Sequence, residues 1–167
     1  GGGVIRTSPD GITWQVRDTG SIDCFSVCWS PELEIFVRVG ILTGAGAIST
    51  SPDGINWTTR TSPATDNWKS VCWSPELGVF VAVGYYGINR IMISFDGINW
   101  TGRASADDTK EWNDACWSPE LGIFVAVSES GTVRVMTSTT TSINSNLFDN
   151  KEPSYYENYE RNRRRSD

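Results

Sequence analysis

Histidine is absent from this chain of 167 residues. Without an imidazole, the chain cannot build a Ser-His-Asp triad, a Cys-His pair or a histidine-based zinc site from its own residues. Those catalytic and metal-binding classes are excluded for the chain acting alone. We therefore expect it to bind no metal and no cofactor.

Positive charge and long hydrophobic runs are also in short supply. The chain has 14 lysines and arginines against 20 aspartates and glutamates, which gives a formal net charge of −6. An acidic chain is not drawn to nucleic acid or to an anionic membrane surface. The longest apolar runs, such as residues 78–84, have the length of a strand, whereas a membrane helix needs about 20 residues. We expect a soluble protein with neither nucleic acid nor a membrane as partner.

Cysteine occurs four times. Three of the four cysteines, Cys28, Cys72 and Cys116, precede a tryptophan at intervals of 44 residues, and Cys24 is the fourth. We expect these equivalent positions to lie too far apart for a disulfide, and so do Cys24 and Cys28 along one strand. The three repeated cysteines are then interpreted as small buried apolar residues. Reduced thiols favour an intracellular location.

Two phrases recur along the chain. Trp-Ser-Pro-Glu-Leu is repeated every 44 residues, starting at Trp29, and Ser-x-Asp-Gly-Ile-x-Trp is repeated every 43, starting at Ser8. Each phrase occurs in three copies. Self-similarity at this period predicts stacked units, each of which can bury its hydrophobic face only against a neighbour.

Each unit is predicted to hold four short strands joined by turns, with no helix. Valines at 79, 81 and 83 alternate with Phe80 and Ala82, which is the two-residue period of a strand. Two hairpins per unit predict an all-β, β-propeller-type array of about three four-stranded antiparallel blades. In the middle unit the strands are expected at residues 68–73, 79–83, 90–94 and 98–103.

The first and last repeat units are incomplete. Residues 4–17 look like the last two strands of an incomplete blade, and units near 25–67, 68–111 and 112–140 follow. Propellers typically close with four to eight blades. The chain is therefore part of a longer propeller, one portion of a ring completed by other copies, or an open array with exposed edges. The out-of-phase cut favours an oligomer that mixes N- and C-terminal strands in one blade.

The polar stretch at residues 141–167 follows the repeats. It is rich in Asn, Ser, Tyr, Glu and Arg, and its low hydrophobicity with mixed charge predicts a disordered tail.

Tryptophan is abundant, with eight residues. Six of them recur in all three units, and we expect those indoles to form the core between blades. Trp100→Ala is accordingly expected to cost about 3–5 kcal/mol of stability. Trp68 and Trp112 occur in only two units, because Cys24 stands at the matching place in the first.

The Ser-x-Asp-Gly-x-x-Trp phrase resembles the Asp-box of sialidase-type (BNR) repeats, whose pattern is Ser-x-Asp-x-Gly-x-Thr-Trp. The chain omits the residue between Asp and Gly, so it resembles the wider class of Asp-box-like propellers, which includes photosystem assembly factors, over about residues 4–138. In that family the Asp accepts backbone hydrogen bonds and the aromatic enters the blade core, away from any catalytic centre. The resemblance implies this structural role for Asp10, Gly11, Trp14, Asp53, Gly54, Trp57, Asp96, Gly97 and Trp100.

Catalytic residues of a sialidase are not recognisable in the chain. Such an enzyme needs an arginine cluster that holds a carboxylate, a Tyr/Glu nucleophile pair and an acid. Arg38, Arg90 and Arg134 are dispersed, and the only tyrosines of the repeats are Tyr85 and Tyr86. Carboxylates that recur in every unit are expected to do the same structural job in each. We expect no enzymatic activity; the alternative is a fragment of a sialidase-like glycoside hydrolase with its catalytic blades outside this chain.

Positions that break the repeat are the better candidates for a ligand site. Arg38 stands where the other units have alanine, and Tyr85 and Tyr86 lie in a loop flanked by glycines. Loops on one face of such scaffolds carry binding, and tyrosine can stack on a sugar ring or a peptide. We predict a non-catalytic binding or scaffold module that recognises a protein or a glycan, in the manner of a lectin or of a structural or attachment protein of a virion.

Overall fold

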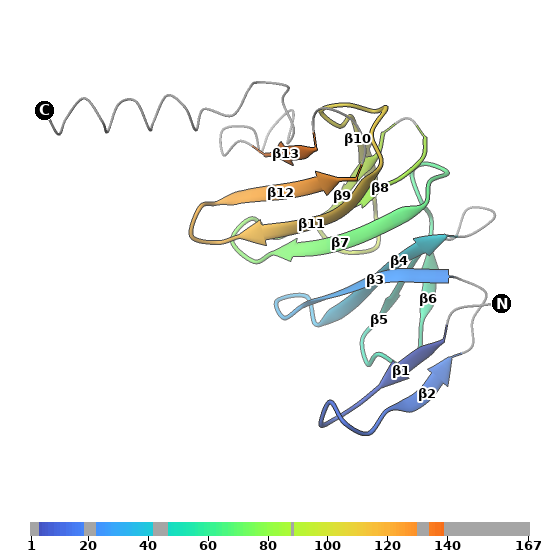
Figure 1. Ribbon diagram of the computed structural model, residues 1–167. Coiled ribbons are helices and arrows are strands. Elements are labelled where there is room, and N and C mark those ends of the chain that lie inside the picture. Colours follow the sequence, from blue (N-terminus) through green and yellow to red (C-terminus); the bar gives the residue numbers. More distant parts are fainter. Residues whose placement is uncertain (1–3, 19–22, 42–46, 88, 130–133, 139–167) are drawn as a thin grey trace, which may run out of the picture.

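The computed structural model describes residues 4–18, 23–41, 47–87, 89–129 and 134–138. Within these ranges the chain forms thirteen strands in four antiparallel sheets and no helix (Figure 1). The predicted all-β, propeller-type fold is confirmed. The predicted tail at 141–167 lies outside the described residues.

Two four-stranded sheets form the middle of the array. We call them blade I and blade II, and each has its strands in sequence order across the sheet. Blade I consists of β3 (Asp23–Ser30), β4 (Ile35–Ile41), β5 (Ile48–Ser51) and β6 (Thr58–Arg60). Blade II consists of β7 (Trp68–Ser74), β8 (Val79–Gly84), β9 (Ile91–Ser94) and β10 (Thr101–Arg103).

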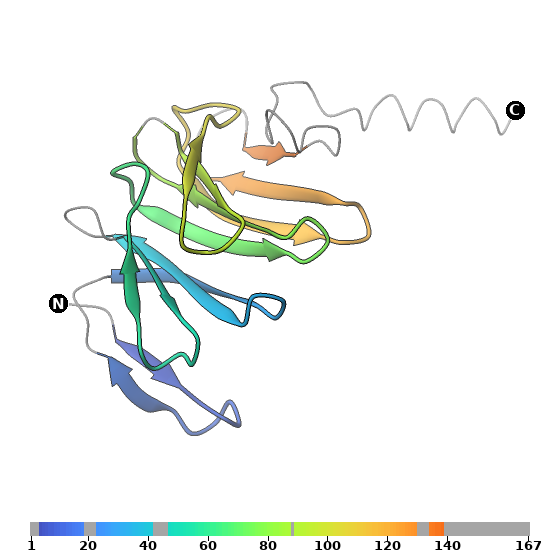
Figure 2. The ribbon, with the colours of Figure 1, turned by 180° about the vertical axis from the view of Figure 1, so that it is seen from behind.

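Incomplete sheets lie at both ends of the array. A hairpin of β1 (Ile5–Thr7) and β2 (Gln15–Asp18) precedes blade I. The three strands β11 (Trp112–Ser118), β12 (Ile123–Ser128) and β13 (Val135–Thr137) follow blade II, and we call them blade III. The first strands β3, β7 and β11 contact one another in turn and run side by side in both views (Figures 1 and 2).

The fourth strand of blade II is shorter than its sequence predicts. Residues 98–103 were expected to be extended, but β10 begins at Thr101. The reason is local: the carboxylate of Asp96 accepts the backbone N–H groups of Ile98 and Asn99, which holds those residues in the turn.

Both faces of blade II are buried. Val81 and Val83 pack into a cluster with blade III, whereas Phe80, Ala82 and Met92 pack into a second cluster with blade I. All five side chains are fully buried. The alternation predicted from the sequence therefore places one row of apolar side chains in each interface between blades.

A repeated hydrogen bond crosses each of these interfaces. The indole Nε1 of Trp73 in blade II donates to Oε2 of Glu32 in blade I at 2.7 Å. The indole Nε1 of Trp117 in blade III donates to Oε2 of Glu76 in blade II, also at 2.7 Å. We call this pair the Trp–Glu latch. It explains why the first repeated phrase contains both residues: the Trp contacts the blade before it, and the Glu contacts the blade after it.

The expectation that the recurring indoles form the core is only partly right. Trp73 and Trp100 are buried, at 9% exposure each, but Trp14 is 55% exposed and Trp29 is 38% exposed. Trp29 lies on the side of blade I that adjoins only the two-stranded hairpin β1–β2. Trp14 is part of that hairpin, and the described residues supply no further sheet beyond it. Trp68 and Trp112, which do not recur in the first unit, are fully buried.

The expectation that the repeated cysteines are buried is wrong for Cys116, which is exposed, while Cys28 and Cys72 are half-buried. The four cysteines form no disulfide with one another. Burial raises the pKa of the Cys72 thiol, and the charges of Cys28 and Cys116 raise it further. The three repeated thiols thus lie close enough to interact electrostatically, because their strands are neighbours. Within the described ranges, no helix has the length and apolar character needed to cross a membrane.

The burial pattern predicts unequal costs for removing two indoles. Trp112→Ala empties a fully buried site and should lower the free energy of unfolding by about 3–5 kcal/mol. Trp14→Ala removes a largely exposed ring and should cost about 1 kcal/mol or less. Urea unfolding followed by far-UV circular dichroism measures both. Equal costs for the two variants would contradict the placement of Trp112 in the core.

Candidate functional site

The strands of each blade divide the molecule into two ends. Both repeated phrases form turns at one end, which we call the turn end, because β3, β7 and β11 run toward it and β6 and β10 run away from it. At the other end, the loop end, the connections differ from blade to blade. The loop end therefore carries the positions that break the repeat.

At the turn end, the aspartate of each Ser-x-Asp-Gly phrase organises a tight turn. Oδ1 of Asp10 accepts the backbone N–H groups of Ile12 and Thr13, both at 2.8 Å. The serine hydroxyl accepts the N–H of the glycine at 2.8 Å in all three copies. That glycine has a φ of 71° to 74°, which favours a residue without Cβ. The indole N–H of Trp14, Trp57 and Trp100 donates to the carbonyl of the glycine in its own turn.

These hydrogen bonds stabilise the charged form of the turn aspartates. The N–H groups of Thr13 and Ile12, with the Ser8 hydroxyl, lower the pKa of Asp10 to about 2. Partial burial pulls the pKa of Asp96 upward, but hydrogen bonds from its turn outweigh this and bring the pKa to about 2. The N–H and side-chain amide of Asn56, followed by the Ile55 N–H and the Ser51 hydroxyl, hold the pKa of Asp53 below its usual range. The lone pairs of these carboxylates are engaged by their own turns.

At the loop end, the loop that follows β8 is held in place by a buried carboxylate. Asp66 is 5% exposed, and its Oδ1 accepts the N–H groups of Asn67 at 2.6 Å, Tyr85 at 3.1 Å and Tyr86 at 2.5 Å. Tyr85 also donates its N–H to the carbonyl of Asn67 at 3.0 Å. Burial raises the pKa of Asp66, while these N–H groups and the charge of Arg90 act in the opposite direction. The backbone beneath the two tyrosines is therefore fixed.

The two tyrosines belong to an aromatic cluster around one lysine. Their rings meet edge to face, with centroids 4.8 Å apart. The ammonium of Lys69, on β7, lies 3.8 Å from the ring centroid of Phe25 and 5.2 Å from that of Tyr85. Phe25, on β3, is 46% exposed, and Tyr86 is 56% exposed. We call Phe25, Lys69, Tyr85 and Tyr86 the loop-end cluster; it joins two blades through cation–π contacts.

An acidic rim lies beside this cluster. A hydrogen bond with Glu111 is the main cause of a raised pKa at the Tyr85 hydroxyl, and the charge of Glu129 adds to it. The cluster thus presents aromatic rings and one cation next to carboxylates.

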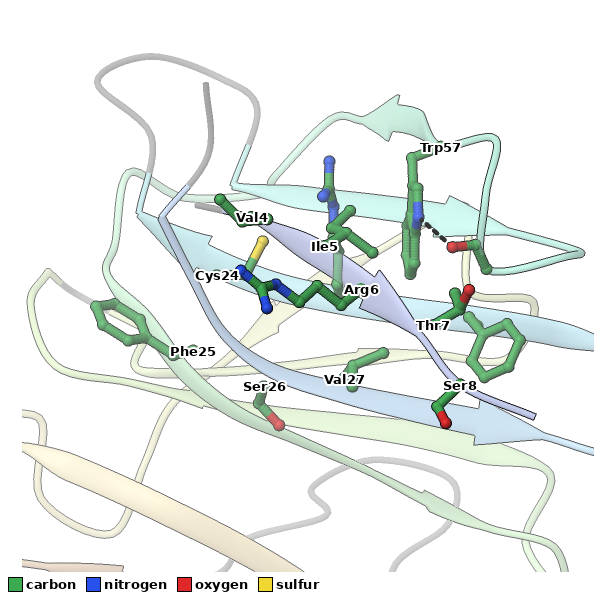
Figure 3. Close-up of a pocket in the computed structure, with 13 residues that line it drawn as sticks. Val4, Ile5, Arg6, Thr7, Ser8, Cys24, Phe25, Ser26, Val27 and Trp57 are labelled. Carbon is green, nitrogen blue, oxygen red and sulfur yellow. Dashed lines mark hydrogen bonds between the residues drawn. The ribbon is translucent and has the colours of Figure 1, made fainter. Parts of the chain in front are cut away.

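Arg38 lies in a different place from the tyrosines. It is 6% exposed, and its guanidinium carbon is 4.7 Å from the centroid of the Trp57 ring. It lines a groove of about 430 Å³ between β1 and the first strands of blade I. Figure 3 shows β1 and its flanking residues, Val4 to Ser8, along one side and Cys24 to Val27 of β3 along the other, with Trp57 at one wall. Phe25 lines this groove and also contacts Lys69, so it links the groove to the loop-end cluster.

Sequence reasoning missed Phe25, Lys69 and Asp66. The signal that could have found them is the same asymmetry that singled out Arg38: at intervals of 44 residues, Phe25 and Lys69 align with Asn113, and Asp66 aligns with Lys110. Metal binding gains no support within the described ranges, where no three His, Cys, Asp or Glu side chains gather in a way that could hold a metal ion.

Comparisons with known proteins show the fold. No family model matches the chain, and no curated protein matches its sequence. The chain is similar in structure to a chain of a nidogen/laminin complex, with a TM-score of 0.58 and 12% identity over 75% of this chain and 48% of that one. It is also similar to YCF48 from Cyanidioschyzon merolae, with a TM-score of 0.54 and 18% identity over 79% of this chain and 44% of that one. The chain spans about half the length of each, and the likeness supports a β-propeller fold.

The turn aspartates predict a particular response to acid. Because their pKa values are lowered in the folded state, the stability they contribute is present above the ordinary value of 3.8 and is lost as pH falls toward about 2. Asp96→Asn keeps an oxygen acceptor but cannot titrate, so its unfolding midpoint should depend less steeply on pH in this window. Denaturant unfolding at stepped pH measures the slope. Asp53→Asn, in another blade, should reduce the slope additively, and an unchanged slope in both variants would contradict the assignment.

The buried carboxylate predicts a local effect on the loop of the tyrosines. Asp66→Ala removes the acceptor of three N–H groups and should speed amide hydrogen exchange at Tyr85 and Tyr86 by about tenfold or more. Asp66→Asn retains an acceptor oxygen and should stay closer to the native rates. Hydrogen–deuterium exchange by mass spectrometry resolves this loop. Equal exchange in both variants would show that Asp66 does not order it.

Proposed function

We propose that the chain is a non-catalytic β-propeller binding module that recognises a protein ligand through the loop-end cluster. In this proposal it acts as a structural or attachment component of a larger assembly. The observation that carries it is the cluster itself. Phe25 and Tyr85 lie around the cation of Lys69, the half-exposed Tyr86 packs on Tyr85, and Asp66 fixes the backbone of the two tyrosines.

The composition of the cluster supports a protein ligand. Aromatic residues are enriched in protein interfaces, where rings with few rotatable bonds supply contact area at low entropic cost. Large rings left exposed on a fixed backbone are unusual unless they contact something. The acidic rim of Glu111 and Glu129 would add charge selectivity around the rings.

The engagement of the recurring acids supports a non-catalytic role. The turn aspartates accept backbone N–H groups, and the glutamates Glu32 and Glu76 accept indole N–H groups across blades. Arg90, a candidate for gripping a substrate carboxylate in a sialidase-like enzyme, donates instead to the carbonyls of Gly87 and Lys110. The same turns, with their Ser, Asp, Gly and Trp contacts, support the proposed kinship with Asp-box-like propellers.

One structural neighbour lends further support. The similar chain found in a nidogen/laminin complex comes from an assembly of two proteins. A propeller of this kind therefore occurs in a protein–protein complex, which is the class of role proposed here.

The proposal predicts which exposed ring matters for binding. A ligand for the wild-type chain is selected from a displayed peptide and protein-domain library, and its affinity is measured for two variants. Tyr86→Ala should weaken binding about tenfold or more, because this ring is the most exposed aromatic side chain of the cluster and packs on Tyr85. Phe95→Ala is the matched control: Phe95 is also 56% exposed but follows β9 at the turn end, and its loss should leave affinity unchanged.

Three outcomes would contradict the proposal. Equal losses for Tyr86→Ala and Phe95→Ala would show that the loop end is not the binding surface. Enrichment on a glycan array, with no protein or peptide selected, would assign the cluster to sugar recognition. Turnover of a fluorogenic sialoside by the purified chain would favour the glycoside hydrolase.

A further inference from the structure

The face of blade I that points away from blade II is more exposed than the same face of blade II. In blade II, Val71, Trp73 and Phe80 pack toward blade I and are 5%, 9% and 0% exposed. At the same repeat positions of blade I, Val27 is 60% exposed and Trp29 is 38% exposed. The residue types are identical, so the difference in exposure comes from the sheet next to each face. Blade II faces the four-stranded blade I, whereas the described residues place only the two-stranded hairpin β1–β2 beside blade I.

On blade III, the face that points away from blade II is exposed in the same way. Val83 and Ile91 of blade II pack against blade III and are fully buried. Their equivalents in blade III, Val127 and Val135, are 42% and 55% exposed. Among the described residues, two different apolar faces are thus left open, and each is one half of an interface that blades I, II and III already form twice.

One half of a Trp–Glu latch is left on each of these faces. On blade I, the indole Nε1 of Trp29 has no acceptor among the described residues; on blade III, Glu120 has no indole there. The carboxylate of Glu120 is already held like that of Glu32, whose latch is closed: Ser118 donates to Oε2 of Glu120 at 3.4 Å, and Ser30 donates to Oε2 of Glu32 at 3.4 Å.

A second hydrogen bond also recurs from blade to blade, and its donor and acceptor positions are likewise left on the two open faces. The hydroxyl of Ser70 accepts the backbone N–H of Ala115 in the next blade at 3.3 Å. At the same repeat positions, blade III carries Asp114 and blade I carries Val27. A carboxylate accepts a backbone N–H at least as well as a hydroxyl does. Oδ1 of Asp114 already accepts the Ser70 hydroxyl at 2.6 Å and the Ala115 N–H at 2.9 Å, so Oδ2 is the oxygen that pairs with the Val27 N–H in the proposed contact.

We propose that the open face of blade I binds the open face of blade III of a second copy of this chain. Trp29 then donates to Glu120 of the second copy, and the Val27 N–H donates to Asp114 of the second copy. The contact is head to tail, and two such contacts close a ring of two copies. This inference does not depend on what the ring binds.

The blade count agrees with closure by two copies. Each copy contributes three sheets that contain a first strand, β3, β7 or β11. Two copies supply six, which lies within the four to eight blades of closed propellers. One copy covers 48% and 44% of the two similar propeller chains, so two copies have about the size of one whole propeller.

The hairpin β1–β2 occupies part of the space that the second copy needs. A Cβ on Gly97 of blade II would lie 3.1 Å from Val37, on the second strand of blade I. A Cβ on the equivalent Gly54 would lie 3.6 Å from Thr7, on β1, which has the sequence of a third strand. The hairpin therefore contacts blade I where blade II meets the second strand of its neighbour, so the proposed contact requires the hairpin to be displaced.

The purified 167-residue chain tests the proposal by its mass in solution. Sedimentation equilibrium at micromolar concentration should give twice the 18.4 kDa of one chain. Val27→Asp and Val127→Asp each place a charge on one open face and should each give a monomer. Ile98→Asp is the matched control: Ile98 is 40% exposed on blade II although that blade has both neighbours, so this variant should stay dimeric.

Mixing the two monomeric variants tests the head-to-tail geometry. Each variant retains one intact face, so an equimolar mixture should form a one-to-one complex and nothing larger. Milder changes test the latch: Trp29→Phe or Glu120→Gln should raise the dissociation constant of the wild-type dimer about tenfold. Far-UV circular dichroism confirms that every variant is folded.

A wild-type chain that stays monomeric at these concentrations would overturn the proposal and leave the faces to another partner. Variants that fail to pair on mixing would rule out the head-to-tail contact even if the wild type is a dimer. A mass that grows steadily with concentration would show an open chain of copies, which also overturns the closed ring.

Discussion

Packing of one sheet face against the next is the interaction on which the whole molecule depends. A four-stranded sheet of this length has two apolar faces and cannot bury either by itself. Blade II, with a neighbour on both sides, buries Phe80, Ala82 and Met92 on one face and Val81 and Val83 on the other. The same residue types become exposed wherever a neighbour is missing. The stability of each blade is therefore a property of the array.

The Trp–Glu latch makes this packing directional. An indole bound to a carboxylate fixes both the spacing and the relative slide of two blades, since a 2.7 Å hydrogen bond tolerates little displacement. Apolar faces alone would accept several registers. Because the Trp always reaches the previous blade and the Glu the next one, the order of blades is encoded in a phrase that every unit contains.

The two ends of the sheets have separate tasks. At the turn end, the aspartates accept hydrogen bonds from backbone N–H groups of their own turns, so the repeated residues there stabilise the fold. At the loop end, the buried carboxylate of Asp66 orders the loop of Tyr85 and Tyr86 in blade II, and Lys69 connects it to Phe25 of blade I. Departure from the repeat at this end creates a surface that differs from blade to blade, which is what recognition of one particular ligand requires.

The sequence by itself determined the strands, the turns and the incomplete units at both ends, because these follow from short-range rules. The rules are a two-residue apolar period, Asp side chains that accept N–H groups two or three residues on, and glycines whose backbone adopts a positive φ. It also placed Tyr85 and Tyr86 in a loop and marked Arg38 as irregular. Only the tertiary structure decided which indoles are buried, since Trp14 and Trp100 occupy equivalent positions and differ in exposure through their neighbours alone. It likewise decided that Phe25, Lys69 and Tyr85 meet while Arg38 lies in a separate groove. The contacts of Lys69 with Tyr85, 16 positions away, and with Phe25, 44 positions away, depend on how the strands and blades are placed, and the local sequence pattern carries no information about that placement.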